Sequence, residues 1–352
     1  PFYEQAATLA KAAGKAGNRP AWYDYAVVVG NWAVALQHVG ELERSLELQR
    51  ERTSALKTAG ASTISIISSE LAAFRIDIDQ GRAAEVLSEI ERMVGQIERW
   101  WQQSQAGKKV AEAPDPEELE HMYLDALDID RQARIAVEQW EVALRQTDAI
   151  LAIRMALKYP IEDIAIYWRN RATILIELGR FGEAQTALQA CLQVFTDDPI
   201  NRARTLHTLA DLFREQGDLQ QAILQGRRAH ALFDTLPSPD DRSASHNNLA
   251  NYLRSSGQAS AIAEAACHRL AALVYAVTAD LGWRLENALH NYVFDSQESG
   301  QKVDPEPSLE RLLADPAFHP LDVWLRQREV DIMEVQAVIR EYLTALRNAQ
   351  PD

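Results

Sequence analysis

The stretch from Leu178 to Leu192 reads LGRFGEAQTALQACL, and a second version from Gln216 to Ala229 reads QGDLQQAILQGRRA. In both, a glycine lies in a polar turn, and apolar and small residues then recur at intervals of three and four. Glycine commonly ends a helix, and this spacing is typical of an amphipathic helix. Each stretch therefore predicts a turn followed by the second helix of a helical hairpin.

The glycine of these turns marks a repeat that extends over most of the chain. The marker positions are Gly40, Gly81, Glu138, Gly179, Gly217, Gly257 and Gln297. The steps between them are 41, 57, 41, 38, 40 and 40 residues. We attribute the one long step to an inserted loop over residues 102–117, which is polar and contains glycine and proline. Such a constant period is the signature of a helical repeat array.

Side chains also recur at fixed distances from the marker. Seven positions before it, four units carry a small residue: Ala33, Ala172, Ala210 and Ala250. Four positions before it, five units carry an apolar residue: Leu36, Leu175, Phe213, Leu253 and Val293. Small and large residues at fixed places are expected where helices pack closely. Two units depart from the pattern, because Asp77 and Arg134 occupy the apolar position.

The repeat resembles the tetratricopeptide repeat, whose first helices are similar to RATILIEL before Gly179 and HTLADLFRE before Gly217. Its period exceeds the usual length of about 34 residues, as in the kinesin light chain and in sensor arrays of bacterial signalling proteins. The segment HNNLANYLRSSG, from His246 to Gly257, is similar to kinesin light chain repeats in particular. The resemblance covers Ala21 to Asp315. It implies an all-α fold, a right-handed α-α superhelix of about seven helix pairs with a C-terminal helix.

The two ends of the chain suggest how the array is framed. Phe2 to Ala13 reads as a second helix without its first, and the chain begins with Pro1, so we expect a piece of a longer protein. At the other end, His319 to Ala349 reads as one long charged helix. We therefore predict a repeat array over residues 1–318 and a capping or linking helix over residues 319–352.

In the resembled family, ligands contact first-helix positions that face the inner wall. Here these lie ten and six residues before the marker, one helical turn apart. In the C-terminal units the pairs are polar: Arg169 and Thr173, His207 and Asp211, Asn247 and Asn251, and Asn287 and Asn291. Arg204, Arg214 and Arg254 lie nearby on the same helices.

Asparagine is an unfavourable residue inside a helix, so a repeated inward pair calls for an explanation. An amide both donates and accepts hydrogen bonds, which suits the backbone of an extended peptide. The resemblance to the kinesin light chain implies the same role, and arginines would hold acidic groups. The alternative is a solvated helix face that binds nothing. In the N-terminal units the same positions are mostly apolar, Gly30 and Val34, then Leu71 and Arg75.

Composition excludes several classes of function. With 36 basic and 51 acidic residues the net charge is −15, which disfavours nucleic acid as a partner. No apolar run approaches the length of a membrane span, so we expect no membrane partner. The two cysteines, Cys191 and Cys267, cannot form a disulfide framework, which favours the cytoplasm.

No motif indicates catalysis, a cofactor or a metal. Phosphate-binding and nucleophile-elbow motifs are absent. His207 and Asp211 have a chelating spacing but lack an evident third ligand, and His246, His268 and His290 fall at scattered helical phases. We therefore predict no enzyme, no cofactor and no metal site.

The sequence predicts a scaffold that binds an extended protein or peptide segment in its concave groove. Two alternatives stay open. The array is a sensor or autoinhibitory domain of a larger bacterial signalling protein with an ATPase, protease or transcription-regulator domain, or it is a structural self-assembly module. The contacts predicted for peptide binding are Asn247, Asn251, Asn287, Asn291, Arg169, Arg204, His207, Arg214 and Arg254.

Overall fold

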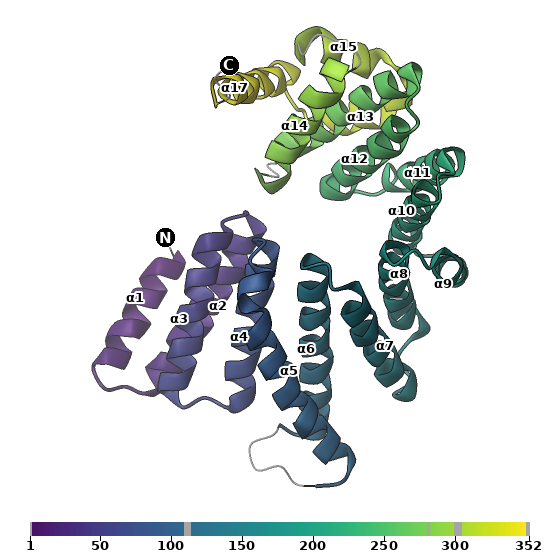
Figure 1. Ribbon diagram of the computed structural model, residues 1–352. Coiled ribbons are helices and arrows are strands. Elements are labelled where there is room, and N and C mark those ends of the chain that lie inside the picture. Colours follow the sequence, from purple (N-terminus) through teal and green to yellow (C-terminus); the bar gives the residue numbers. More distant parts are fainter. Residues whose placement is uncertain (1, 109–113, 280–281, 299–304, 350–352) are drawn as a thin grey trace. The chain divides into compact units, whose positions relative to one another are not determined.

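The computed structural model describes residues 2–108, 114–279, 282–298 and 305–349 (Figure 1). Within these residues it contains seventeen α-helices, one short 3-10 helix and no strand, which confirms the all-α prediction. The chain divides into two compact units, residues 1–160 and 161–352, and each is described by itself.

The N-terminal unit consists of seven helices. They are α1 (Phe2–Lys15), α2 (Pro20–His38), α3 (Leu42–Ala59), α4 (Thr63–Asp79), α5 (Ala83–Gln105), α6 (Pro116–Ala136) and α7 (Trp140–Ala156). Most consecutive helices pack against one another, and α4 also packs against α6 (Figure 1).

The C-terminal unit holds the remaining helices. They are α8 (Ile161–Glu177), α9 (Phe181–Val194), α10 (Pro199–Glu215), α11 (Leu219–Phe233), α12 (Pro239–Ser255), α13 (Ala259–Thr278), α14 (Gly282–Glu298), α15 (Pro305–Ala314), the 3-10 helix η1 (Pro316–Phe318), α16 (His319–Gln327) and α17 (Ile332–Ala349). From α2 to α15 the described helices form seven successive pairs along the chain, as the sequence predicted.

Six of the seven marker residues follow the first helix of their pair in the expected conformation. Gly40, Gly81, Gly179, Gly217 and Gly257 all have positive φ, between 67° and 81°. Glu138 adopts the same left-handed conformation with φ 59°, although it carries a side chain. This conformation lets a helix stop and the chain reverse. The register is therefore confirmed for the irregular units at Gly81 and Glu138.

The core sits where the small and apolar positions recur. Ala33, Ala172, Ala210 and Ala250 are all at most 1% exposed, and so are Leu175 and Leu253. Small side chains at these places let the paired helices approach closely. Helix starts are fixed by caps: Asp115, Asp198, Asp218 and Ser238 each accept a hydrogen bond from a backbone N–H of the first turn.

Three boundaries differ from the prediction. Gln297 does not end a helix, because α14 continues through it to Glu298. The predicted single helix over His319–Ala349 is two, since α16 ends at Gln327 and Glu329 takes a left-handed turn with φ 52° before α17. The inserted loop is shorter than 102–117, because α5 extends to Gln105 and α6 begins at Pro116; residues 109–113 lie outside the described residues.

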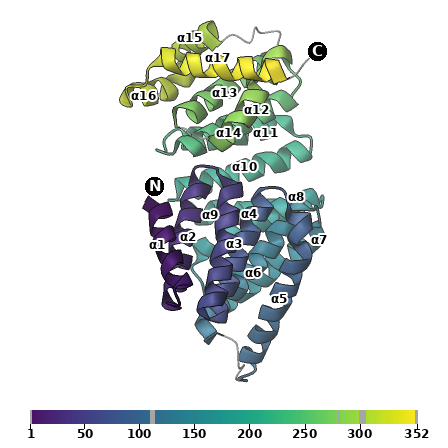
Figure 2. The same ribbon diagram turned by 90° about the vertical axis from the view of Figure 1, so that its left-hand side faces the viewer.

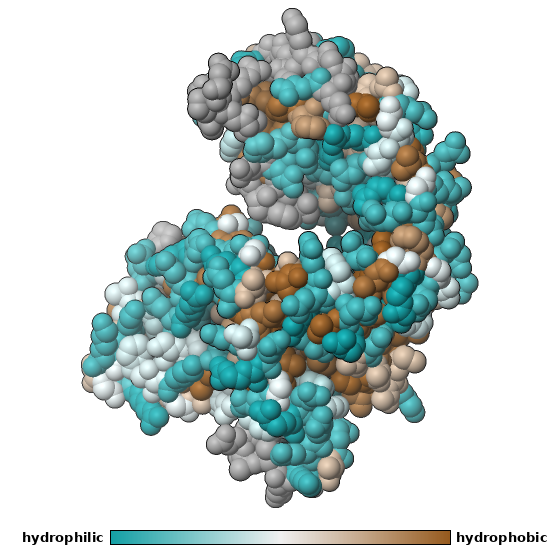
Figure 3. All heavy atoms as spheres, in the orientation of Figure 1, coloured by the Kyte–Doolittle hydropathy of each residue, from teal (hydrophilic) through white to brown (hydrophobic). Residues whose placement is uncertain are grey.

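The end of the C-terminal unit is organised around α13. This helix packs against α12, α14, α15 and α17, and α17 also packs against α15 (Figure 2). By length and composition α13 is apolar enough to cross a membrane, but 67% of that stretch is buried within the structure, as expected of a core helix. On each unit, hydrophilic side chains cover much of the surface visible in Figure 3, with apolar ones between them.

Candidate functional site

The candidate site lies on α10, α12 and α14, the first helices of three successive pairs. Six of the nine predicted contacts are on α10 and α12, namely Arg204, His207, Arg214, Asn247, Asn251 and Arg254. Their arrangement depends on two residues that the sequence did not single out. These are Arg269 on the second helix α13 and Asp295 near the end of α14.

Arg269 is buried, with a side chain only 3% exposed, and Asp295 beside it is 1% exposed. The Arg269 Nε donates to Asp295 Oδ2 at 2.8 Å. Its two terminal nitrogens donate to Asn247 Oδ1 at 2.9 Å and to Asn251 Oδ1 at 2.6 Å, and one also donates to the Asn247 carbonyl at 3.0 Å. A buried charge is stable only when it is paired and hydrogen-bonded, and this guanidinium meets both conditions.

This contact fixes the direction of both asparagine amides. A guanidinium only donates, so each amide must turn its oxygen toward Arg269 and its NH₂ group away. Among the residues that the structure describes, no acceptor is within hydrogen-bonding distance of Nδ2 of Asn247 or Asn251. Asn251 is exposed and Asn247 is half-buried. Asn247 and Asn251 therefore present donors, not acceptors, on this face.

A pocket of about 550 Å³ opens beside them, lined by Arg214, Asn251, Arg254 and Ser255. Three of these four residues are predicted contacts. The guanidinium carbon of Arg254 lies 4.3 Å from the centroid of the Phe294 ring, and its Nε is 3.3 Å from Asp295 Oδ1. The pocket lining thus combines two guanidinium groups, one amide and one hydroxyl, a set suited to ligands that accept hydrogen bonds.

Arg214 is held on the α10 side of this pocket. Its terminal nitrogens are 3.4 Å from Asp211 Oδ1 and 3.1 Å from Glu215 Oε1. The guanidinium also lies 5.9 Å from the Tyr252 ring centroid. Burial raises the pKa of Asp211, which also accepts a hydrogen bond from the Tyr252 hydroxyl at 3.2 Å. Asp211 is therefore tied to Arg214 and Tyr252.

His207 lies inside the helix packing and not on the exposed face. It is 8% exposed, its ring packs 5.2 Å from that of Phe233, and its Nδ1 is 3.2 Å from Asn248 Nδ2. Burial lowers its pKa to about 4, so the ring is neutral at physiological pH. The buried His207 ring is therefore not available as a contact for a ligand.

The other four predicted contacts lie outside the pocket. Arg169 is half-buried and donates to Asn201 Oδ1 at 3.0 Å, and burial lowers its pKa. Arg204 is exposed and lies 3.3 Å from Asp241 Oδ1. Asn287 and Asn291 bond to each other on α14, with Asn291 Nδ2 donating to Asn287 Oδ1 at 2.8 Å.

The sequence missed other residues because only packing brings them together. Arg269 and Asp295 are 26 residues apart and follow no repeat spacing. His230, His246 and His268 are buried and converge, although their spacing along the chain gave no sign of it. Cys191 is fully buried in the core.

Part of the chain matches a known family by sequence. Residues 163–235 match the tetratricopeptide-repeat family model. The matched segment begins in α8 and ends just after α11, so it includes the two stretches on which the sequence-based prediction rested. A search of curated protein sequences finds no match to the chain.

Solved structures extend the likeness of fold beyond that segment. The apo form of RapI superposes with a TM-score of 0.56 at 15% identity, covering 93% of this chain and 81% of that one. A signal-transduction ATPase with a tetratricopeptide-repeat sensor, from Pyrococcus horikoshii, gives 0.51 at 11% identity, covering 91% and 46%. A putative kinesin light chain repeat protein of Podosopora anserina gives 0.41 at 21% identity, covering 55% and 88%. The family match and the first two superpositions show that the chain is a tetratricopeptide-like array, and at these low identities the superpositions show the fold alone.

Proposed function

We propose that this chain is a non-catalytic scaffold that binds an extended, acidic segment of a partner polypeptide on the face of α10, α12 and α14. The observation that carries the proposal is the orientation of Asn247 and Asn251. Arg269 takes both amide oxygens and leaves both NH₂ groups as donors, and Asn251 lines an open pocket.

The chemistry of the pocket defines the ligand. An extended peptide presents a backbone carbonyl at every residue, and each accepts a hydrogen bond from a fixed amide donor. Arg214 and Arg254 add charge-assisted hydrogen bonds to a carboxylate, and Arg binds such groups in a planar, two-pronged way. A side chain of Asp or Glu, or a terminal carboxylate, is thus the expected anchor.

The comparisons support this proposal only through the fold. Among the structural neighbours, one Rap protein has been solved in complex with a competence and sporulation factor, and that binding is a property of the Rap protein. The sensor and self-assembly roles that the sequence left open remain predictions. The cytoplasmic location expected from the sequence also stays a prediction.

Selection of binding peptides from a displayed random library, with the full chain as bait, tests the proposal. We expect the selected peptides to share an Asp or Glu. Changing that residue to Asn or Gln should weaken binding about tenfold, because a hydrogen bond to a charged group contributes about 1.5 to 3 kcal/mol.

Variants locate the binding surface. Arg254→Ala and Asn251→Ala should each weaken binding of the selected peptide about tenfold. Arg326→Ala is the matched control, because Arg326 is exposed on α16 of the same unit and also pairs with a carboxylate, that of Asp322. If the control weakens binding as much as Arg254→Ala, or if both pocket variants bind like the original chain, the proposed surface is wrong.

A further inference from the structure

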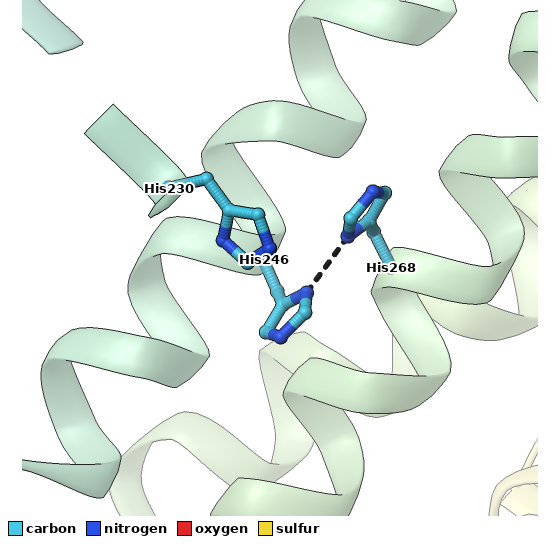
Figure 4. A group of neighbouring side chains, drawn as sticks. All are labelled: His230, His246 and His268. Carbon is cyan, nitrogen blue, oxygen red and sulfur yellow. Dashed lines mark hydrogen bonds between the residues drawn. The ribbon is translucent and has the colours of Figure 1, made fainter. Parts of the chain in front are cut away.

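Three histidines from three successive helices meet inside the C-terminal unit. His230 on α11, His246 on α12 and His268 on α13 are 9%, 2% and 6% exposed. One ring nitrogen from each lies within 4.8 Å of the others, and Nδ1 of His246 is 2.7 Å from Nδ1 of His268 (Figure 4). Nothing in the proposed peptide-binding role uses these side chains.

Carboxylates lie behind two of the rings. His230 Nε2 is 3.4 Å from Asp234 Oδ2, and His268 Nε2 faces Glu264 Oε1 at 3.9 Å. Histidines that bind metals usually direct their second ring nitrogen to a carboxylate, which fixes the ring and leaves the first nitrogen as a lone pair. With Nε2 of His268 turned to Glu264, its Nδ1 is left to act as a ligand. Nδ1 of His230 lies 3.2 Å from the Ser245 hydroxyl oxygen, so either nitrogen of this ring would exchange a polar contact for the metal ion.

Two features favour a cation at the centre of the cluster. Two Nδ1 lone pairs at 2.7 Å repel each other unless a proton or a cation lies between them. Asp234 Oδ1 is buried and has no hydrogen-bond partner among the described residues. A buried carboxylate oxygen without a donor is costly, and a nearby cation offsets that cost.

The neighbouring charges oppose each other. The positive charge of Arg242 lowers the pKa of His230 and of His246. Its guanidinium is fixed in place, because it donates to the Leu236 carbonyl at 2.7 Å and to the Tyr275 hydroxyl at 3.3 Å. It disfavours a second cation, whereas Asp234 favours one. Burial lowers the pKa of all three histidines, so the rings are neutral and available as ligands at physiological pH.

We propose that His230, His246 and His268 bind one divalent late first-row metal ion, with zinc as the reference ion. Imidazole nitrogens suit zinc, copper, nickel and cobalt. Tetrahedral zinc with Zn–N bonds of about 2.0–2.1 Å requires nitrogens about 3.3 Å apart. That spacing lies between the 2.7 Å pair and the 4.8 Å limit seen here, so small ring movements complete the site. A buried ion would tie α11, α12 and α13 together, and its role is structural.

Titration of the untagged, chelator-treated chain with cobalt tests this directly. We expect one cobalt ion per chain, with the strong visible absorption of a tetrahedral site, and its displacement by zinc. Saturating zinc should raise the midpoint of thermal unfolding by about 5 °C or more. Failure of the chain to bind either ion would overturn the proposal.

His268→Gln should weaken cobalt and zinc binding about 100-fold or more, and Glu264→Ala, which removes only the group behind the ring, about 10- to 100-fold. His207→Gln is the matched control, since His207 is also a buried histidine, on the adjacent α10, and outside the cluster. Equal affinity in His268→Gln and His207→Gln would refute the site.

X-ray absorption at the zinc edge of the loaded original chain decides the question without any variant. Three imidazole nitrogens at about 2.0 Å support the site. A shell of sulfur, or of oxygen without imidazole, refutes it.

Discussion

The two compact units place different residues at the same position of the repeat, four residues before the marker. In the C-terminal unit this position holds Leu175, Phe213 and Leu253, and the two leucines are at most 1% exposed. In the N-terminal unit two of its three pairs hold Asp77 and Arg134 there, and both are buried as well. The backbone register is the same, because the markers Gly81 and Glu138 both have positive φ.

The charged residues persist at this position because neighbours neutralise them. Asp77 is 3.0 Å from Arg82 and 3.2 Å from Arg50. Arg134 lies 3.0 Å from Asp130 and also pairs with Glu91. In the N-terminal unit each of these buried charges is thus paired with side chains of opposite charge. In the C-terminal unit the buried Arg269 also binds two asparagines, of which Asn251 lines a pocket, and the proposed binding surface rests on this contact.

Exchanging the residue types at this position should affect the two units very differently. Leu253→Asp places a carboxylate at a fully apolar position and should lower the free energy of unfolding by about 4 kcal/mol. Asp77→Leu should change it by only about 1 kcal/mol, because the Arg50 side chain is already 63% exposed and its charge turns to water.

Urea denaturation followed by circular dichroism measures both changes, and Leu175→Ala provides a control for lost packing without a buried charge. Equal losses of stability in Leu253→Asp and Asp77→Leu would show that neither unit requires an apolar residue at this position.

Lowering the pH should destabilise the C-terminal unit more than the N-terminal unit. Both histidines of the N-terminal unit, His38 and His121, are exposed or half-buried, whereas four in the C-terminal unit are buried. Burial lowers the pKa of His207 to about 4 and that of His230 to about 3. Between these values and the unfolded value of about 6.5, the unfolded chain takes up protons that the folded unit does not, so stability falls as the pH drops.

For His207 alone this loss approaches about 3 kcal/mol at pH 4. Asp234 acts in the opposite direction, because burial raises its pKa to about 6 and its folded form binds a proton first. Hydrogen exchange in metal-free buffer, corrected for intrinsic rates, should show the C-terminal unit losing protection before the N-terminal one. His207→Gln should reduce the difference in protection between the two units. If both units lose protection at the same pH, the buried histidines are not the cause of the acid sensitivity.

Periodicity was sufficient to predict the helices, because helix ends and core faces depend on neighbouring residues. It failed at Gln297, which lies inside α14, and at Glu329, where a charged residue takes a left-handed turn. The asparagines were found from their inward positions. Their orientation was not, because it depends on Arg269 from a second helix and Asp295 from the following pair, and such contacts are set by packing, not by spacing.

The smallest expected effect concerns the marker itself. Glu138 holds the left-handed position that glycine occupies in five other units, with φ 59°. A side chain in this conformation costs about 1 kcal/mol, and glycine avoids that cost. Glu138→Gly should therefore raise the free energy of unfolding by up to about 1 kcal/mol.

Gly179→Ala is the converse change in the C-terminal unit, and it should lower the free energy of unfolding by about 1 kcal/mol. A Cβ at Gly179 would meet nothing within 4 Å, so the loss measures backbone strain and not a clash. Thermal and urea unfolding of both variants give the two values. If the two changes in the free energy of unfolding are similar in size and opposite in sign, the same turn conformation is used in both units. A loss of stability in Glu138→Gly would mean that the glutamate side chain contributes more than its strained backbone costs.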